Sequence, residues 1–295
     1  MRKIIILSIL IFASLIGHAA NYNEYTIEEP TTDISAPSMT QESFESNNTT
    51  LRYWLYTPAE VADNMPLLIY LHGGSGKGDD LNIVIGNGFP KYLHDGDLGN
   101  IKSYVIIPQL PKEVNGWLNV ATTLRDMISS VVNRFHCDKS RISITGHSMG
   151  GTGTWAIAAK FPDMFHRIAP LSGSITNSEA NIQALKESNI WAFVGSADVI
   201  VKPQSTIDFI NSLNSPTAKC TIINGATHFD VPEVYLSQEY KLVDWLLEEN
   251  TNTSVRDVYT DKTLDDADYY DLLGRKIKKP TKGLYIHKGK LINKF

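Results

Sequence analysis

Ser148 is flanked by more glycine than an ordinary turn requires. It lies in the stretch RISITGHSMGGTGTW, residues 141–155, in which Gly146 and Gly150 complete the pattern G-x-S-x-G. In this pattern the serine occupies a sharp strand-to-helix turn that exposes its hydroxyl, and the glycines let the two backbones approach more closely than a Cβ would allow. A helix-capping serine would explain Ser148 but not the glycines. We therefore interpret Ser148 as a candidate nucleophile.

A neutral serine hydroxyl is a poor nucleophile and needs an adjacent base, which a carboxylate in turn orients. In enzymes with this kind of turn, the acid and then the histidine follow the serine along the chain. Asp198 comes directly after the apolar run WAFVGS (191–196), and His228 follows the run CTIING (220–225). Both therefore lie where strands are expected to end, in the required order. The alternative for each residue is an ordinary solvated loop position.

Other histidines and acids fit these roles less well. Asp208 falls within an expected helix, and Asp230 comes after His228. Of the remaining seven histidines, His18 lies in the N-terminal leader, His94 in a loop and His287 in the C-terminal tail. His136 and His166 precede strands. His72 comes before Ser148 in the sequence, and His147 is directly beside it.

Acyl transfer at Ser148 would also require two backbone N–H groups for the developing oxyanion. One is expected from Met149, directly after the serine, and the second from a loop that follows an earlier strand. The stretch LHGGSGKGDD (71–80) is such a loop, with Gly74 or Ser75 as the donor. Its GSGKG segment resembles a phosphate-binding loop, but Leu71 and Gly78 break that pattern at two fixed positions. No metal-ligand spacing is evident, and we expect neither a metal nor another cofactor.

The elements that must position these residues alternate along the chain. A hairpin is expected over Met39–Pro58, followed by apolar strand-like runs at 66–73, 103–109, 141–146, 167–173, 191–196 and 220–225. Helical patterns are expected over Trp117–Phe135, Met149–Phe161, Gln204–Leu213 and Leu236–Glu249. This alternation predicts an α/β fold, with a mainly parallel sheet and helices on both faces, whose functional residues follow the carboxyl ends of the strands.

With these features in place, residues 50–250 resemble the α/β-hydrolase superfamily. The resemblance is carried by LHGGSGKGDD, GHSMGGTGTW, GSADVIV and GATHFD, together with Pro108, Gln109, Pro111 and Trp117. It is narrowest to secreted esterases and predicted peptidases related to polyhydroxybutyrate depolymerases, dienelactone hydrolases, and feruloyl or acetylxylan esterases. The resemblance implies Ser148, Asp198 and His228 as a catalytic triad, with His72 and Ser75 near the substrate. Trp117 either forms a wall of the substrate pocket, as the resemblance suggests, or packs in the core.

Both ends of the chain differ from this central domain. Arg2 and Lys3 precede a 13-residue apolar run and a small-residue cleavage site, which predicts a signal peptide over 1–19 and export to the periplasm, the cell surface or the medium. A polar leader is expected over 20–37, the catalytic domain over 38–250 and a linker over 251–267. The tail, 268–295, is basic and resembles a type IX secretion sorting domain cut down to about two strands. It either engages sorting machinery or is a half-ordered basic tail.

Charge and cysteine content limit the other possibilities. Without Arg2 and Lys3, the 27 basic residues become 25 against 32 acidic ones, which argues against nucleic-acid binding by the main domain. Cys137 and Cys220 are expected to lie about 14 Å apart, three strand spacings, too far for a disulfide.

These observations predict a secreted serine hydrolase of carboxylic esters, and the resemblance implies acetyl or feruloyl groups linked to polysaccharides as its substrates. A serine peptidase with the same triad is the first alternative. A non-catalytic carbohydrate-binding protein on a hydrolase scaffold is the second, although no triad member is missing.

Overall fold

The computed structural model describes residues 36–248 and four short C-terminal segments, 269–270, 276–277, 283–287 and 290–294. The predicted signal peptide, nearly all of the leader and the linker 251–267 lie outside the described residues. Within the described residues, no helix combines the length and the apolar character that a membrane span requires.

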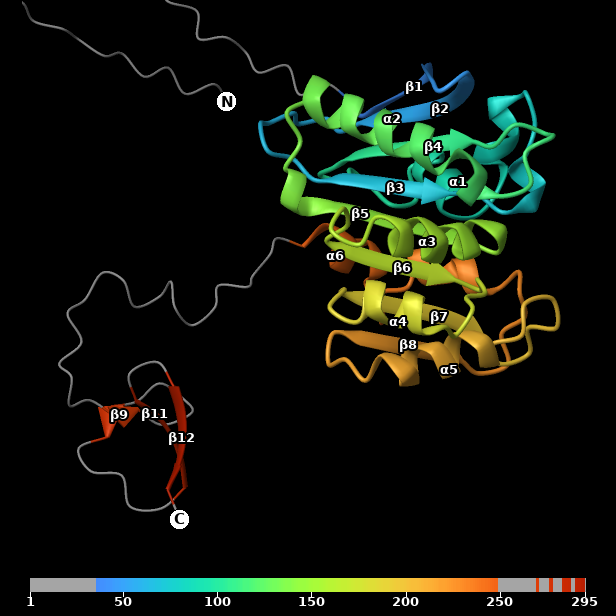
Figure 1. Ribbon diagram of the computed structural model, residues 1–295. Coiled ribbons are helices and arrows are strands. Elements are labelled where there is room, and N and C mark those ends of the chain that lie inside the picture. Colours follow the sequence, from blue (N-terminus) through green and yellow to red (C-terminus); the bar gives the residue numbers. More distant parts are fainter. Residues whose placement is uncertain (1–35, 249–268, 271–275, 278–282, 288–289, 295) are drawn as a thin grey trace, which may run out of the picture. The chain divides into compact units, whose positions relative to one another are not determined.

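The central domain contains one eight-stranded sheet (Figure 1). Its spatial order is β1-β2-β4-β3-β5-β6-β7-β8, and every neighbouring pair from β4 to β8 is parallel. The strands are β1 (Ser38–Ser46), β2 (Thr49–Thr57), β3 (Leu67–Leu71), β4 (Tyr104–Gln109), β5 (Ile142–His147), β6 (Arg167–Leu171), β7 (Ile190–Gly195) and β8 (Ala218–Ile223). The mainly parallel sheet predicted from the apolar runs is therefore confirmed.

The two antiparallel strands form the predicted hairpin at one edge of the sheet. Ser46 pairs with Thr49, and the two residues between them, Asn47 and Asn48, have φ values of 53° and 55°. Two consecutive positive φ angles are those of a type I′ turn, whose twist matches that of the flanking strands, and asparagine tolerates them well. Strand β2 then pairs antiparallel with β4 and joins the hairpin to the parallel part of the sheet.

Helices cover both faces of the sheet. The α-helices are α1 (Gly88–His94), α2 (Ala121–Arg134), α3 (Met149–Lys160), α4 (Glu179–Leu185), α5 (Gln204–Leu213) and α6 (Leu242–Leu247). Short 3-10 helices are η1 (Gly74–Gly76), η2 (Leu81–Gly86), η3 (Trp117–Val120), η4 (Lys139–Arg141) and η5 (Val231–Tyr235).

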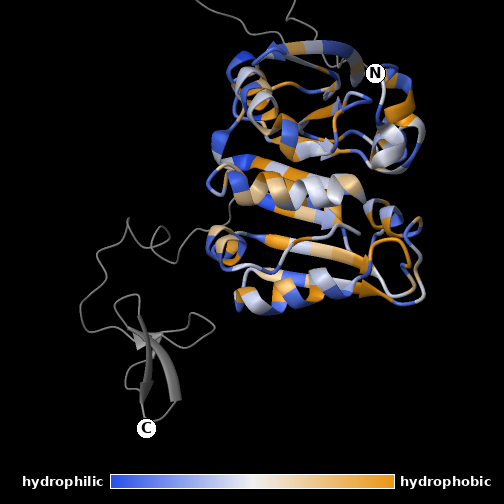
Figure 2. Cartoon of the chain, turned by 45° about the vertical axis from the view of Figure 1, so that its right-hand side comes forward, coloured by the Kyte–Doolittle hydropathy of each residue, from blue (hydrophilic) through white to orange (hydrophobic). Residues whose placement is uncertain are grey.

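Strand β3 shows how the two faces divide the core. Leu67, Ile69 and Leu71 pack with α2, α3, α4 and α5, whereas Leu68 and Tyr70 pack with α1, η5 and α6. All five side chains are buried, because successive residues of a strand point to opposite faces and both faces are covered. Figure 2 shows apolar residues along the strands and both polar and apolar residues on the helices.

The last predicted helix is shorter than its sequence pattern suggested. We predicted a helix from Leu236, but α6 begins only at Leu242. Lys241 has φ of 48°, a left-handed conformation that a right-handed helix cannot contain, so the chain turns there instead. Helices α1 and α4, of seven residues each, were not predicted because they are too short to show a clear apolar period.

The two cysteines are both free, as predicted. Strands β5, β6, β7 and β8 are consecutive neighbours in the sheet, so the strand order assumed in that prediction is correct. Cys137 is buried before β5, and Cys220 is half-buried within β8.

The C-terminal segments form a separate four-stranded antiparallel sheet in the order β10-β9-β11-β12. Its strands are β9 (Tyr269–Tyr270), β10 (Lys276–Ile277), β11 (Gly283–His287) and β12 (Lys290–Lys294). The described segments of the tail therefore form four short strands, whereas we predicted about two.

Candidate active site

Ser148 sits at the corner between β5 and α3 in a strained backbone conformation. Its φ and ψ angles are 60° and −120°, a region that residues other than glycine rarely occupy. Its N–H donates to the carbonyl oxygen of Leu171 at the end of β6 (2.9 Å), and its own carbonyl accepts the first helical hydrogen bond from Thr152 (2.9 Å). The turn is thus held by the neighbouring strand on one side and by the helix on the other.

Gly146 and Gly150 are required by the closeness of the surrounding backbone. A Cβ on Gly146 would lie 2.5 Å from the carbonyl oxygen of Leu71, and a Cβ on Gly150 would lie 1.8 Å from the same atom. Both distances are far below van der Waals contact. Strand β3 therefore passes so close to the β5–α3 corner that no side chain fits at either position.

The three residues singled out from the sequence meet at this corner. The Nε2 atom of His228 lies 2.8 Å from the Ser148 Oγ, and its Nδ1 atom lies 2.8 Å from Oδ2 of Asp198. His228 and Asp198 expose only 4% and 5% of their surfaces, whereas Ser148 is half-buried. The arrangement is a continuous hydrogen-bonded chain that runs from a buried carboxylate to a reachable hydroxyl.

The surroundings of Asp198 keep its carboxylate ionised. Burial alone would raise the pKa of Asp198, but hydrogen bonds from His228 and from backbone N–H groups outweigh it and hold the pKa below its ordinary value. The N–H groups are those of Ile200 and Val201, each 2.9 Å from Oδ1. Oδ1 accepts these two backbone hydrogen bonds, and Oδ2 faces the imidazole. A charged carboxylate beside Nδ1 favours the His228 tautomer that carries its proton on that nitrogen.

The loop that carries His228 is closed by a short polar turn. The Thr227 N–H and hydroxyl both donate to Oδ2 of Asp230, at 2.8 and 2.6 Å. Asp230 is therefore engaged in shaping the loop, and Asp208 lies exposed on α5. Neither of the alternative acids contacts the His228 imidazole in the described structure.

His72 and Trp117 do not line an accessible surface, contrary to the substrate-binding roles that the resemblance implied. His72 exposes 4% of its surface and Trp117 only 1%. The Trp117 Nε1–H donates to the His72 carbonyl oxygen (3.1 Å), and the indole packs so tightly on α3 that a Cβ on Gly153 would lie 2.5 Å from it. Of the two roles left open for Trp117, the structure therefore shows core packing.

The buried His72 imidazole instead ties two loops together. Its Nε2 accepts the Leu110 N–H at 2.9 Å, and its Nδ1 lies 2.6 Å from the Gly73 carbonyl oxygen, to which it donates. Burial lowers the pKa of His72 to about 4, so the ring is neutral at pH 7 and can hold both contacts. Gln109, to which we had assigned no function, donates from Nε2 to the carbonyl oxygens of Gly76 and Asp80 at 3.0 and 2.8 Å. These side chains fix the loop that begins at Gly73.

The fixed loop borders the nucleophile. A Cβ on Gly73 would lie 3.4 Å from the Ser148 Cβ and 4.0 Å from its Oγ. Gly74 begins the 3-10 helix η1 and Met149 begins α3, so each N–H lies in a first turn and lacks a partner within its own helix. Gly74 and Ser75 are both exposed. The predicted oxyanion donors therefore lie on the two elements that flank Ser148.

Three exposed apolar residues follow Asp198 and His228 along the chain. Phe229, next to His228, exposes 75% of its surface, and its ring lies 5.5 Å from the imidazole at nearly a right angle. Val199 and Ile200, which follow Asp198, expose 87% and 57%. These three exposed apolar residues lie on the two loops that the Asp198–His228 hydrogen bond joins, and we refer to them as the apolar rim.

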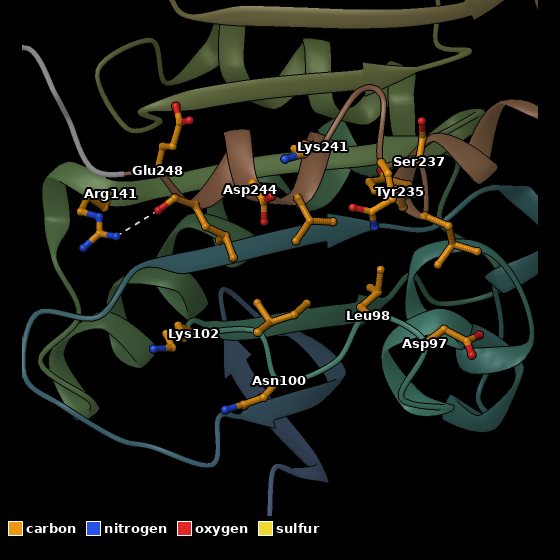
Figure 3. Close-up of a pocket in the computed structure, with 15 residues that line it drawn as sticks. Asp97, Leu98, Asn100, Lys102, Arg141, Tyr235, Ser237, Lys241, Asp244 and Glu248 are labelled. Atoms are coloured by element: carbon orange, nitrogen blue, oxygen red, sulfur yellow. Dashed lines mark hydrogen bonds between the residues drawn. The ribbon is translucent and has the colours of Figure 1, made fainter.

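A separate pocket of about 590 Å³ lies between α6 and residues 97–102 (Figure 3). Its lining combines charged and polar side chains, including Lys102, Asp244 and Glu248, and contains no member of the triad. Within the described residues, no three His, Cys, Asp or Glu side chains form a group that could hold a metal ion.

Comparison with known proteins points to esterases. Residues 111–215 match the family model described as putative esterase, a range that includes Ser148 and Asp198. The chain is 34% identical over 109 residues to cutinase est2 of Thermobifida alba, covering 36% of this chain and 34% of that protein. It is 26% identical over 156 residues to feruloyl esterase B of Thermothelomyces thermophilus, covering 48% and 50%.

Among solved structures, a thermostable esterase aligns with a TM-score of 0.61 at 23% identity, covering 70% of this chain and 62% of that one. Together with the strand order, this likeness shows that the chain has the α/β-hydrolase fold. The chain spans about a third of the length of the cutinase and half of that of the feruloyl esterase.

Proposed function

We propose that this protein hydrolyses carboxylic esters, with Ser148 as nucleophile, His228 as general base and acid, and Asp198 as the residue that orients the imidazole. The observation that carries the proposal is the hydrogen-bonded chain from Asp198 through His228 to Ser148, with two contacts of 2.8 Å, at a strained turn. The esterase match over residues 111–215 supports the same chemistry.

The reaction follows from the placement of these groups. As the Ser148 Oγ attacks the ester carbonyl carbon, its proton passes to Nε2 of His228, and the Asp198 carboxylate stabilises the imidazolium that forms. The tetrahedral intermediate collapses when Nε2 returns the proton to the departing alcohol oxygen, which leaves an acyl group on Ser148. Water then attacks this acyl-enzyme with His228 again as base, and releases the carboxylic acid and the free serine.

The oxyanion is held in this proposal by the N–H groups of Met149 and Gly74. The first lies at the N-terminus of α3, where the helix dipole also favours negative charge. The second belongs to the peptide that begins at Gly73, the residue bordering Ser148. Removal of one such donor typically costs about 2.7–4 kcal/mol of transition-state stabilisation.

We propose ester groups carried on plant polysaccharides, acetyl or feruloyl, as the natural substrates. The similarity to a feruloyl esterase supports this class. The apolar rim formed by Val199, Ile200 and Phe229 supplies a surface suited to an apolar or aromatic part of the substrate.

The proposal is tested by rates of hydrolysis of p-nitrophenyl acetate, methyl ferulate, acetylated xylan and a short peptide, with Ser148→Ala measured in parallel. We expect Ser148-dependent hydrolysis of the esters and little or none of the peptide. Preferential peptide cleavage would support the peptidase alternative. The absence of Ser148-dependent turnover on every ester would overturn the proposal.

Asp198→Asn is expected to lower kcat about 10³–10⁴-fold. An asparagine amide fits the same space but can donate to Nδ1, which leaves the proton on Nε2 and prevents that nitrogen from accepting the Ser148 proton. Steady-state kinetics on p-nitrophenyl acetate would measure the loss. Asp208→Asn, on the exposed side of α5, is the matched control and should retain wild-type kcat. Equal activity of the two variants would contradict the role of Asp198.

We further propose that residues 1–19 direct export and that the basic tail, 268–295, engages sorting machinery. The charged and apolar pattern of the N-terminus and the composition of the tail support this.

A further inference from the structure

We infer that His147 is a positioning residue that ties the backbone of His228 to the nucleophile turn. The inference rests on the proposed function and concerns a side chain to which the sequence analysis gave no role. His147 precedes Ser148 and ends strand β5. Its Nε2 lies 2.9 Å from the carbonyl oxygen of His228 and donates to it, and the two imidazole rings lie 4.7 Å apart.

Apart from hydrogen bonds within the loop itself, the main chain of the His228 loop is bonded to the segment that follows β7. Ala197 N–H donates to the Ala226 carbonyl oxygen (3.0 Å), and Gly225 N–H donates to the Ser196 hydroxyl (2.8 Å). These contacts fix the His228 loop relative to Asp198, but Ser148 belongs to a different corner of the sheet. The hydrogen bond from His147 links that corner directly to the residue whose imidazole must face the serine.

The hydrogen bond from His147 to the His228 carbonyl oxygen can control the orientation of the His228 imidazole. A carbonyl held at residue 228 fixes the peptide plane beside its Cα, and therefore the direction in which the imidazole leaves the backbone. A reacting group misplaced by about 1 Å can cost about 10²-fold in rate. Because the contact does not involve the ester, its loss should affect kcat much more than KM.

The charge state of His147 fits this role. Burial, together with repulsion from the neighbouring His228, lowers the pKa of His147 to about 4, although the hydrogen bond to the His228 carbonyl oxygen and the Asp198 carboxylate act in the opposite direction. At neutral pH the ring is therefore uncharged and does not oppose the positive charge that His228 acquires during the reaction. A neutral imidazole that donates from Nε2 carries its single proton on that nitrogen.

Two substitutions separate the hydrogen bond from the ring contact. His147→Phe keeps a flat ring against His228 but removes the donor, whereas His147→Gln removes the ring but retains an N–H donor at a similar reach. We expect kcat on p-nitrophenyl acetate to fall about 10–100-fold in His147→Phe, with KM changed by less than about twofold. His147→Gln should remain within about threefold of the wild-type kcat.

The rate of inactivation by phenylmethylsulfonyl fluoride provides a second readout, since it reports the activation of Ser148 without an ester. It should fall in His147→Phe in parallel with kcat and be restored in His147→Gln. Thermal unfolding of each variant controls for folding, and His147→Leu replaces the phenylalanine variant if that chain is insoluble. Wild-type kcat in the donor-free variant, or equal losses in the phenylalanine and glutamine variants, would overturn the inference. A wild-type protein without Ser148-dependent turnover would instead overturn the proposed function.

Discussion

Ser148→Ala is expected to lower kcat for ester hydrolysis about 10⁴–10⁶-fold. The substitution removes the atom that forms the acyl-enzyme, so the two-step reaction is no longer available. What remains is attack by water, assisted by the oxyanion donors and by substrate binding. Because Met149, Gly74 and the apolar rim are untouched, the variant should still bind the ester.

The measurement is the initial rate of p-nitrophenyl acetate hydrolysis at neutral pH, with thermal unfolding as the control for folding. Serine and alanine both carry a Cβ, so the backbone strain at a φ angle of 60° is similar for the two residues. The unfolding temperature should therefore change little. A variant that folds normally and retains more than about a tenth of the wild-type kcat would contradict the assignment of the nucleophile.

Gly150→Ala is expected to destabilise the folded domain by about 3–5 kcal/mol. The added Cβ would lie 1.8 Å from the Leu71 carbonyl oxygen and 2.8 Å from that of His72. Both obstacles are backbone atoms at the end of β3, so no side-chain rotation can make room. Either β3 or the start of α3 must move, and such a shift would also displace Ser148 and the loop that carries Gly74.

Urea-induced unfolding, followed by circular dichroism, measures this loss. Gly86→Ala is the matched control, because a Cβ there meets nothing within 4 Å and Gly86 is exposed. The control should change the free energy of unfolding by less than about 0.5 kcal/mol. A Gly150→Ala protein as stable as the control would show that the corner is less tightly packed than the distances indicate.

The meeting of Ser148, Asp198 and His228 could be predicted because sheet topology limits where the residues that follow strands come together. Apolar runs locate the strands, and in a parallel sheet all the carboxyl ends lie along one edge. Ser148, Asp198 and His228 each follow such a run, so their meeting required only that the strands β5, β7 and β8 belong to one sheet. The G-x-S-x-G pattern was equally informative, because its glycines report a backbone approach that the structure shows at Leu71.

The roles of His72, Trp117 and His147 and the start of α6 could not be predicted, because they depend on contacts and backbone angles that no local sequence pattern encodes. His72 and Trp117 lie in segments that resemble an active-site loop, yet their side chains turn inward and hold that loop by hydrogen bonds. His147 stands in the motif itself, but its partner is a backbone carbonyl 81 residues away. The late start of α6 reflects a single left-handed residue, Lys241, within an otherwise helical apolar pattern.

Covalent labelling of the active protein tests the central claim most directly. The wild type is treated with a fluorophosphonate, digested with trypsin and analysed by mass spectrometry, with loss of esterase activity followed in parallel. We predict one phosphonate per chain, on Ser148 within the peptide Ile142–Lys160, formed in step with inactivation; Ser143 in the same peptide is buried and bonded to the Leu246 carbonyl oxygen. Inactivation with the label on any other residue, or esterase activity that persists after Ser148 is fully labelled, would contradict the account.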